Sequence, residues 1–348
     1  SHPRLEFVCT VCEEVGMEGA TGIDVSMLKG KKLLNMDSEE EGVMLASCAG
    51  GCRADVKLPV ERETVSGTKL TVSLSGLTGG HSGSEIDKGR GNANTLMSRL
   101  LRDASAPVAI ASIEGGRKDN AIPRECTAQI IVAPDEAAAV KASIEQAAAE
   151  IAEEFKASDP DLKLTVSEET DCSESAISAK DSARVIALIE ALPNGIIRMS
   201  REIDKLVETS LNLGVLKSDD AAVTLRYAVR SSVGVAKKSL KNQLVCIAGA
   251  FAAEVTFEGD YPAWEYVEDS KLRILMGDTY REMYKKEPVM EVIHAGVECG
   301  LFSEKMPGLD CVSYGPDIFD IHTPQERLSI SSTKRIYEYT VEVLKRLK

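Results

Sequence analysis

The sequence lacks several features that would place the protein in a specialised class. None of its apolar runs reaches the ~18 residues that a membrane-spanning helix needs, and no internal repeat or low-complexity tract stands out. Positive charge is scarce: 41 Lys and Arg stand against 55 Asp and Glu, for a net charge of −14. A nucleic-acid surface needs a basic stripe to neutralise phosphates. We therefore expect small-molecule partners, with no nucleic acid and no membrane.

The cysteines lack the spacing of a disulfide framework. Nine of them are scattered over 348 residues, without the dense, even spacing typical of small secreted domains, so we expect a reducing, cytoplasmic environment. Cys9-x-x-Cys12 and Cys48-x-x-x-Cys52 leave open a structural zinc knuckle or a redox motif. In an extended strand, however, residues i and i+3 point to opposite faces, so buried hydrophobic cysteines are the favoured interpretation.

The length and the first residues of the chain predict its organisation. A chain of 348 residues exceeds the usual size of one domain, so two domains are expected. The sequence opens at "SHPRLEF", without a methionine, and enters a strand-like pattern almost at once. We expect that it is a fragment that lacks the N-terminal part of its first domain.

Residues 5–12 and 32–36 are short apolar runs separated by an amphipathic piece, "EGATGIDVSML". This pattern of two apolar runs around an amphipathic piece predicts a β-α-β unit in a parallel sheet with a right-handed crossover. The first run ends on Glu13 and Glu14, and the second is followed by Asp37. Because ligands of open α/β sheets bind beyond the carboxyl ends of the strands, we expect these three carboxylates to converge on one edge.

The middle of the sequence predicts a separate α+β domain over residues 53–262. Its expected strands cover residues 68–77, 106–116, 125–133, 162–169 and 254–259, and its expected helices cover residues 92–104, 134–155, 182–192 and 237–252. Residues 209–232 predict a hairpin that turns at Asp219 and Asp220. Residues 263–348 return to helix, loop and strand, and close with a helix over 331–347 whose N-cap is a serine. Residues 1–52 and 263–348 would then form one α/β domain interrupted by the middle domain.

Adjacent carboxylates at a strand end suit metal chemistry. Their side chains point to different sides, so one can bind a metal while its neighbour faces the metal-bound water. The metal lowers the pKa of that water to about 7, and the free carboxylate can accept its proton. The alternative is an exposed acidic edge, which is our interpretation of residues 38–41, "SEEE", apart from any role that they have in holding the loop.

Histidine is also scarce, with four in the chain: His2, His81, His294 and His322. His81 is preceded by two glycines in "TGGHSGSE", which predicts an exposed loop. A lone histidine is more often structural than a ligand. His322, in "DIHTPQE", follows the last apolar run of the α/β domain, where an imidazole and two carboxylates would make a zinc shell.

Eight motifs follow one another along the chain: "TVCEEVGMEG", "LLNMDSEEEG", "CAGG", "GLTGGHSG", "GRGNAN", "NAIPRE", "IHAGVECGLF", and "GP" followed by "HTPQE". With these motifs in this order, the chain resembles the bacterial aminoacyl-histidine dipeptidases. These Xaa-His, carnosinase-like enzymes belong to the aminoacylase and carboxypeptidase G superfamily of dinuclear zinc peptidases. The resemblance implies a phosphorylase/hydrolase-like zinc-peptidase domain with a mostly parallel central sheet, interrupted by an inserted α+β lid and dimerisation domain.

The resemblance also implies catalytic and metal-binding roles. Glu13 would be the general base, and Glu14, Asp37 and His322 would bind two zinc ions. His81 would come from the lid domain, often that of a partner subunit, to stabilise the oxyanion of the tetrahedral intermediate. Cobalt and manganese accept similar ligands.

Four further residues are implied to bind the substrate. Asn120 in "DNAIPRE" and Arg230 in "RYAVRSS" would hold it from the lid, and the guanidinium of Arg230 suits a carboxylate. The loop at Gly296 would line the pocket, and Glu298 would meet the substrate amine.

The sequence departs from the family pattern upstream of Glu13. Family members carry there a His-x-Asp and an Asp that bridges the two zinc ions, and neither has a counterpart in this sequence. The expected function is hydrolysis of dipeptides, with a C-terminal histidine preferred, by a homodimeric parent enzyme. The alternatives are a related peptidase or amidohydrolase that acts on tripeptides or N-acyl amino acids, and an incomplete fragment that serves as a lid and dimerisation unit.

Overall fold

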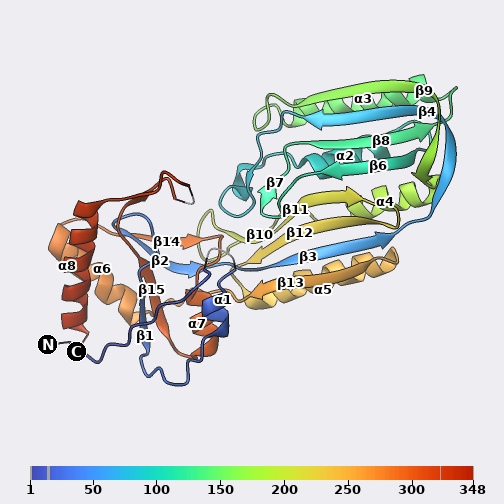
Figure 1. The fold of residues 1–348 in the computed structure, drawn as a ribbon. Coiled ribbons are helices and arrows are strands. Elements are labelled where there is room, and N and C mark those ends of the chain that lie inside the picture. The colour runs from blue at the N-terminus through green and yellow to red at the C-terminus, as the bar shows by residue number, and fades with distance from the viewer. Residues whose placement is uncertain (1, 14–15, 322, 348) are drawn as a thin grey trace. The chain divides into compact units, whose positions relative to one another are not determined.

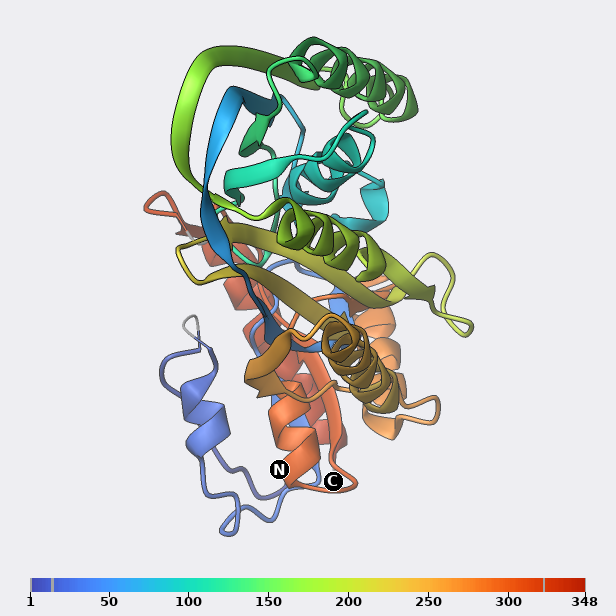
Figure 2. The same cartoon turned by 90° about the vertical axis from the view of Figure 1, so that its right-hand side faces the viewer.

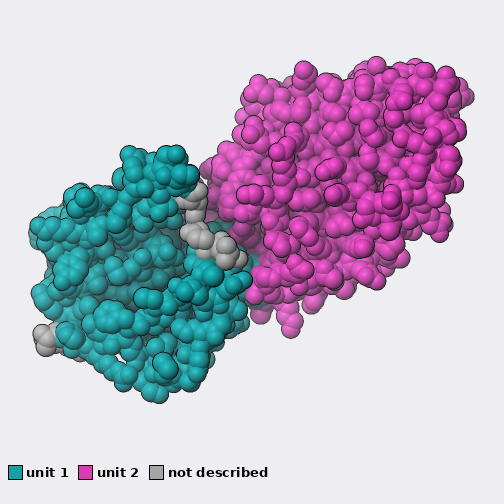
Figure 3. Space-filling model, viewed as in Figure 1, with its two compact units in different colours: residues 1–51, 231–234, 261–348 teal, residues 52–230, 235–260 magenta. Residues whose placement is uncertain are grey.

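The structure is a computed structural model that describes residues 2–13, 16–321 and 323–347. The chain divides into two compact units, shown in different colours in Figure 3. Unit 1 contains Ser1–Gly51, Ser231–Gly234 and Tyr261–Lys348, and unit 2 contains Cys52–Arg230 and Val235–Asp260. Within the described residues, no helix is both long and apolar enough to cross a membrane.

Unit 1 is built on a mixed sheet in which the strand order is β1-β15-β2-β14 (Figure 1). The strands are β1 (Lys32–Asn35), β2 (Val43–Cys48), β14 (Val289–Ile293) and β15 (Asp310–Tyr314). β1 pairs with β15 and β14 with β2 in parallel, whereas β15 and β2 are antiparallel. Every residue of β2 is buried, as expected for a strand that is covered on both faces. The expected α/β class with a mostly parallel sheet is confirmed.

Apolar clusters form on both faces of this sheet. Met44 and Val312 point to the face covered by α6 (Lys271–Tyr284) and α8 (Ile330–Arg346). Val43 and Cys311, one position away along their strands, point to the other face and pack with Trp264 and with α7 (Cys299–Lys305). α1 (Glu18–Gly22) packs on α7 through a further small cluster.

Unit 2 contains a nine-stranded sheet with the order β13-β3-β12-β11-β6-β8-β4-β9, in which β10 also pairs with β11. The strands are β3 (Gly50–Pro59), β4 (Arg62–Ser75), β6 (Ala109–Gly115), β8 (Cys126–Val132), β9 (Lys163–Ile177), β10 (Gly195–Met199), β11 (Val207–Ser218), β12 (Ala222–Ser231) and β13 (Glu254–Tyr261). Figure 2 shows the helices on one face of this sheet. They are α2 (Ala93–Arg102), α3 (Ala137–Glu154), α4 (Ala179–Ala191) and α5 (Gly234–Ala250).

The alternation of apolar and polar residues explains the one-sided packing of unit 2. On β4, Leu70, Val72 and Leu74 are buried in the core below the helices. α2 begins where the side chain of Asn92 accepts hydrogen bonds from the N–H groups of the second and third helical residues. The hairpin expected over residues 209–232 is confirmed, since Asp219 exchanges hydrogen bonds with Ala222 across the turn between β11 and β12.

The strand expected over residues 5–12 is wrong, because residues 2–12 lie in neither strand nor helix. A strand is stable only when a neighbour satisfies its backbone groups. In this segment the Val11 carbonyl instead accepts a hydrogen bond from the Gly19 N–H (2.9 Å). The Glu6 carboxylate accepts from the N–H groups of Lys29 and Gly30, each at 2.9 Å. The expected β-α-β unit is therefore wrong too, and β1 pairs with β15 at the other end of the sequence.

The burial expected for the cysteines holds for one pair. Cys48 and Cys52 are buried, whereas Cys9 and Cys12 are exposed. The burial expected for Cys9 and Cys12 is wrong because it depended on the strand, which did not form.

Candidate active site

Asp37 lies two residues beyond β1, at an edge of the unit 1 sheet. Since β1 and β15 run in parallel, the chain that follows β15 starts from the same edge. The Oγ atoms of Ser38 and Ser313 are 2.9 Å apart. Gly315 packs so tightly that a Cβ there would lie 1.7 Å from the Ser38 carbonyl oxygen. The segment that leads to His322 therefore begins beside Asp37, while His322 itself lies outside the described residues.

Glu13 occupies a turn and not the end of a strand. Its carbonyl accepts hydrogen bonds from the N–H groups of Gly16 (3.1 Å) and Met17 (2.9 Å), just before α1, and its side chain is half-buried. Glu14 lies outside the described residues, so the expected grouping of Glu13, Glu14 and Asp37 stays a prediction.

The part of the chain that the structure describes contains no group of three His, Cys, Asp or Glu residues that could hold a metal ion. Two of the expected zinc ligands, Glu14 and His322, fall outside that part. All four cysteines of the zinc-knuckle interpretation fall inside it. The zinc-knuckle interpretation is therefore wrong.

Gly296 and Glu298 lie in the loop between β14 and α7. The pKa of the next residue, Cys299, is raised by its hydrogen bond with Cys311, by burial and, to a smaller extent, by the nearby charge of Asp37. The side chain of Glu298 is buried, and its Oε2 accepts a hydrogen bond from the Thr10 hydroxyl (2.9 Å). Its Oε1 is buried and has no hydrogen-bond partner among the described residues. A buried carboxylate oxygen without a donor is costly. A cationic ligand such as an amine would satisfy it.

In unit 2, the structure brings His81 next to Asn120. His81 ends the short strand β5 (Gly80–His81), which pairs with β7 (Ala121–Ile122) so that His81 lies opposite Ala121. The Ser82 N–H donates a hydrogen bond to the Asn120 carbonyl (2.9 Å). Arg230, at the end of β12, is close enough for its charge to lower the pKa of His81. The three unit 2 residues that the sequence predicted to act on the substrate are thus grouped together.

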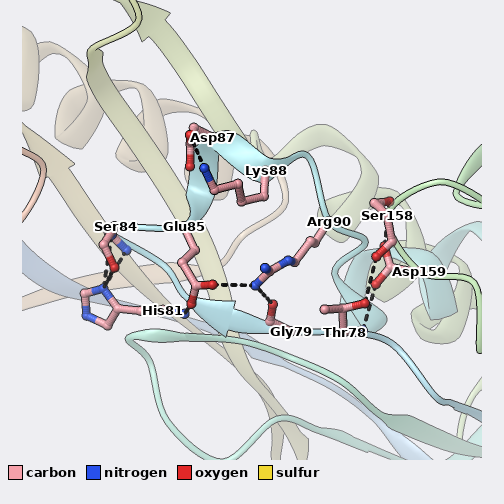
Figure 4. Close-up of polar contacts among 11 residues, drawn as sticks. Thr78, Gly79, His81, Ser84, Glu85, Asp87, Lys88, Arg90, Ser158 and Asp159 are labelled. Atoms are coloured by element: carbon pink, nitrogen blue, oxygen red, sulfur yellow. Dashed lines mark hydrogen bonds and ion pairs between the residues drawn. The ribbon is translucent and has the colours of Figure 1, made fainter. Parts of the chain in front are cut away.

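The hydrogen bonds of His81 define which ring nitrogen carries the proton. Nδ1 accepts from the N–H groups of Gly83 (3.2 Å) and Ser84 (3.1 Å), as the close-up in Figure 4 shows for Ser84. Because Nδ1 is an acceptor, the neutral ring carries its proton on Nε2. Burial, and then the charge of Arg230, lower the pKa of His81 from its ordinary value of 6.5. At neutral pH His81 is therefore a neutral hydrogen-bond donor through Nε2.

Asn212 is a supporting residue that the sequence reasoning missed. Its side chain is buried in β11, and Nδ2 donates to the carbonyls of Asp119 and Ala121, each at 2.9 Å. These two bonds fix the backbone on both sides of Asn120. A polar amide inside the apolar run "SLNLGVL" was the available signal.

The described residues thus contain a mixed α/β unit with Asp37 just beyond a strand end, and an antiparallel unit that groups His81, Asn120 and Arg230. Residues 72–159 match the peptidase dimerisation domain family. The cytosol non-specific dipeptidase of Escherichia coli (strain K12) is 36% identical over 350 residues, which cover 99% of this chain and 72% of that protein. The crystal structure of aminoacylhistidine dipeptidase from Vibrio alginolyticus aligns with a TM-score of 0.90 at 34% identity, over 97% of this chain and 70% of that chain.

The chain belongs to the aminoacyl-histidine dipeptidase family of M20 peptidases, which are metal-dependent hydrolases of dipeptides.

Proposed function

We propose that the protein hydrolyses Xaa-His dipeptides of the carnosine type and uses zinc as its metal. The observation that carries the substrate side of this proposal is the grouping of His81, Asn120 and Arg230. Glu14, Asp37 and His322 would hold the metal. A carboxylate and an imidazole are ligands that zinc accepts, and the exposed Asp37 at a sheet edge suits this donor set. The metal supplies an activated water at neutral pH.

Four residues of the chain would have separate roles in the reaction. Glu13 accepts a proton as water attacks the peptide carbonyl, and returns it to the leaving amine. His81 donates a hydrogen bond from Nε2 to the oxygen that gains negative charge. Asn120 and Arg230 hold the substrate, with the guanidinium of Arg230 on its C-terminal carboxylate.

The partnerless oxygen of Glu298 favours a substrate with a free amine. A dipeptide carries a cationic amine that would satisfy Oε1, whereas an N-acyl amino acid has none. Glu298, with the adjacent Gly296 loop lining the pocket, therefore favours dipeptide hydrolysis over the second candidate activity, hydrolysis of N-acyl amino acids.

We also propose that the protein is a cytoplasmic homodimer. Residues 53–262 would form its lid and dimerisation domain, and residues 1–52 and 263–348 its catalytic domain. The match of residues 72–159 to a dimerisation domain family supports this arrangement.

The test replaces the proposed base in the metal-loaded enzyme. Glu13→Gln should lower kcat for β-alanyl-histidine by at least about 100-fold, because glutamine cannot accept the proton. Metal analysis should find the same zinc content as in the wild type, since Glu13 is not a ligand. The control is Glu18→Gln, an exposed carboxylate on α1. Near-normal turnover by Glu13→Gln would contradict its role, and equal hydrolysis of the N-acetylated peptide would contradict the substrate assignment.

A further inference from the structure

An ion pair between Glu85 and Arg90 closes the loop that carries His81, and neither residue has a role in the catalysis proposed above. We infer that Glu85 and Arg90 are positioning residues for His81, and that they hold its ring as the neutral form that donates from Nε2. This inference rests on the proposed role of His81 in catalysis. It concerns residues of unit 2 alone, and Figure 4 shows them.

Glu85 closes the turn in both directions. Its Oε2 accepts a hydrogen bond from the backbone N–H of His81 (2.8 Å), and its own N–H donates to the His81 carbonyl (3.1 Å). Its Oε1 accepts from Nη1 of Arg90 (2.8 Å), and that nitrogen also donates to the Gly79 carbonyl (2.5 Å). One carboxylate and one guanidinium therefore fix the backbone on both sides of residue 80.

Gly80 shows how tightly this pair packs on the backbone. Its φ of +136° is a conformation that residues with a Cβ rarely adopt. A Cβ at Gly80 would lie 2.3 Å from Nη1 of Arg90 and 2.7 Å from Oε2 of Glu85. The pair therefore occupies the space where any other side chain would begin, directly before His81.

The closed turn determines the protonation of the His81 ring. In the closed turn, the N–H groups of Gly83 and Ser84 donate hydrogen bonds to Nδ1, at 3.2 and 3.1 Å. If Glu85 or Arg90 is lost, this pair of donors separates from Nδ1, and the ring can carry its proton on either nitrogen. The hydrogen bond that His81 offers to the substrate would then have neither a fixed direction nor a fixed donor atom.

A separate anchor keeps the loop folded when the pair is removed. The buried carboxylate of Asp159 accepts hydrogen bonds from the N–H groups of Thr78 and Gly91, each at 2.8 Å, at the two ends of the loop. The side chains of Glu85 and Arg90 are in contrast 37% and 20% exposed. Substitution of the pair should therefore disturb the His81 turn without unfolding unit 2.

The experiment compares Glu85→Ala, Arg90→Met and Arg90→Lys in the metal-loaded enzyme. Glu85→Ala and Arg90→Met should lower kcat about 10- to 100-fold and leave KM within about twofold of the wild type. The reason is that a misplaced donor stabilises the transition state less well but does not change substrate binding. Arg90→Lys should keep most of kcat, because one ammonium can donate to both Gly79 and Glu85. The matched control is Glu154→Ala, which removes the Arg99–Glu154 ion pair elsewhere in unit 2.

A second measurement reads the ring directly, without turnover. Long-range 15N–1H NMR of the His81 imidazole should show protonated Nε2 and unprotonated Nδ1 in the wild type, in Glu154→Ala and in Arg90→Lys. Glu85→Ala and Arg90→Met should show a mixture of the two neutral forms. Both variants should unfold at the same thermal midpoint as the wild type.

The outcomes separate this inference from the proposed function. His81→Ala should lower kcat about 100- to 1,000-fold, the usual cost of an oxyanion donor. If it does, while Glu85→Ala and Arg90→Met keep the kcat and the single ring form of the wild type, the inference is wrong and the proposed function stands. A loss of activity that follows a lower thermal midpoint, with the ring form unchanged, would also overturn the inference. If His81→Ala leaves kcat unchanged, both the inference about Glu85 and Arg90 and the proposed role of His81 are wrong.

Discussion

At the scale of single residues, Asp159 shows how one buried carboxylate organises a segment that is distant in the sequence. Besides the two backbone groups at the ends of the His81 loop, its Oδ2 accepts from the Ser158 hydroxyl (2.8 Å). Three donors thus satisfy a side chain that is 1% exposed. A charge as deeply buried as this is tolerated only with such compensation.

Asp159→Ala should loosen the His81 loop. The substitution leaves three donors without their acceptor, at a cost of about 2 kcal/mol or more, which corresponds to roughly 30-fold faster local opening. Hydrogen–deuterium exchange of residues 78–91, measured by mass spectrometry, should accelerate accordingly. Asp161→Ala, an exposed carboxylate two residues away, should leave the exchange unchanged. Equal exchange in both variants would show that water replaces the carboxylate at no cost.

At the scale of elements, α8 is anchored by Glu41, the last acidic residue of the run 38–41. Glu39 and Glu40 are exposed, as expected for the run 38–41, whereas Glu41 is half-buried and has the loop-holding role that the interpretation left open. Its carboxylate accepts two hydrogen bonds from Arg335 of α8, from Nε and Nη2, each at 2.6 Å. Its N–H donates to Asp317 (2.8 Å) in the segment after β15. Glu41 therefore ties α8 to the loop that carries Asp37.

Glu41→Gln should destabilise unit 1 in a pH-dependent way. The hydrogen bonds from Arg335 lower the pKa of Glu41 below its ordinary value of 4.5. A lowered carboxyl pKa contributes stability that is present above 4.5 and is lost as the pH falls through the folded-state pKa. Wild type and variant should therefore differ by about 1–2 kcal/mol at neutral pH and converge in acid.

Fluorescence of Trp264 can measure this difference. It is the single tryptophan of the chain, and it is buried in unit 1, so urea titrations followed by its emission report on that unit. Glu39→Gln, in the same loop, is the control and should behave like the wild type. A difference between wild type and Glu41→Gln that persisted unchanged in acid would rule out the ion pair as its source.

At the scale of the whole molecule, the proposed homodimer allows His81 to act in the partner's active site. Glu13→Gln and His81→Ala should each be inactive when alone. In a mixed dimer, one site receives both defects and the other receives none. Random pairing of equal amounts should therefore recover about a quarter of the wild-type kcat. Recovery after co-refolding, measured with the Xaa-His substrate, tests this arrangement. No recovery in verified mixed dimers would mean that His81 serves its own chain.

Much of the secondary structure could be predicted from the sequence because it depends on local patterns. α3, α4 and α8 begin and end within a few residues of the expected bounds, since an apolar stripe and, for α4 and α8, a capping serine are local signals. The hairpin of β11 and β12 was equally visible, because Asp219 marks its turn.

Strands whose partners are distant were harder to predict. β2 was missed because a continuous buried run does not reveal its partner, and β3 was missed although its residues alternate between buried and more exposed positions. Residues 5–12 were assigned to a strand, but they pair with no strand among the described residues. The sequence by itself determined the local helices and turns, and its motifs pointed to Glu13, His81 and Asp37. Tertiary structure alone decided that β5 meets β7, that Asp159 joins the two ends of the His81 loop, and that Arg335 holds Glu41. These contacts join residues up to 294 positions apart. Their energy depends on which backbone groups folding brings together, and no local pattern contains that information.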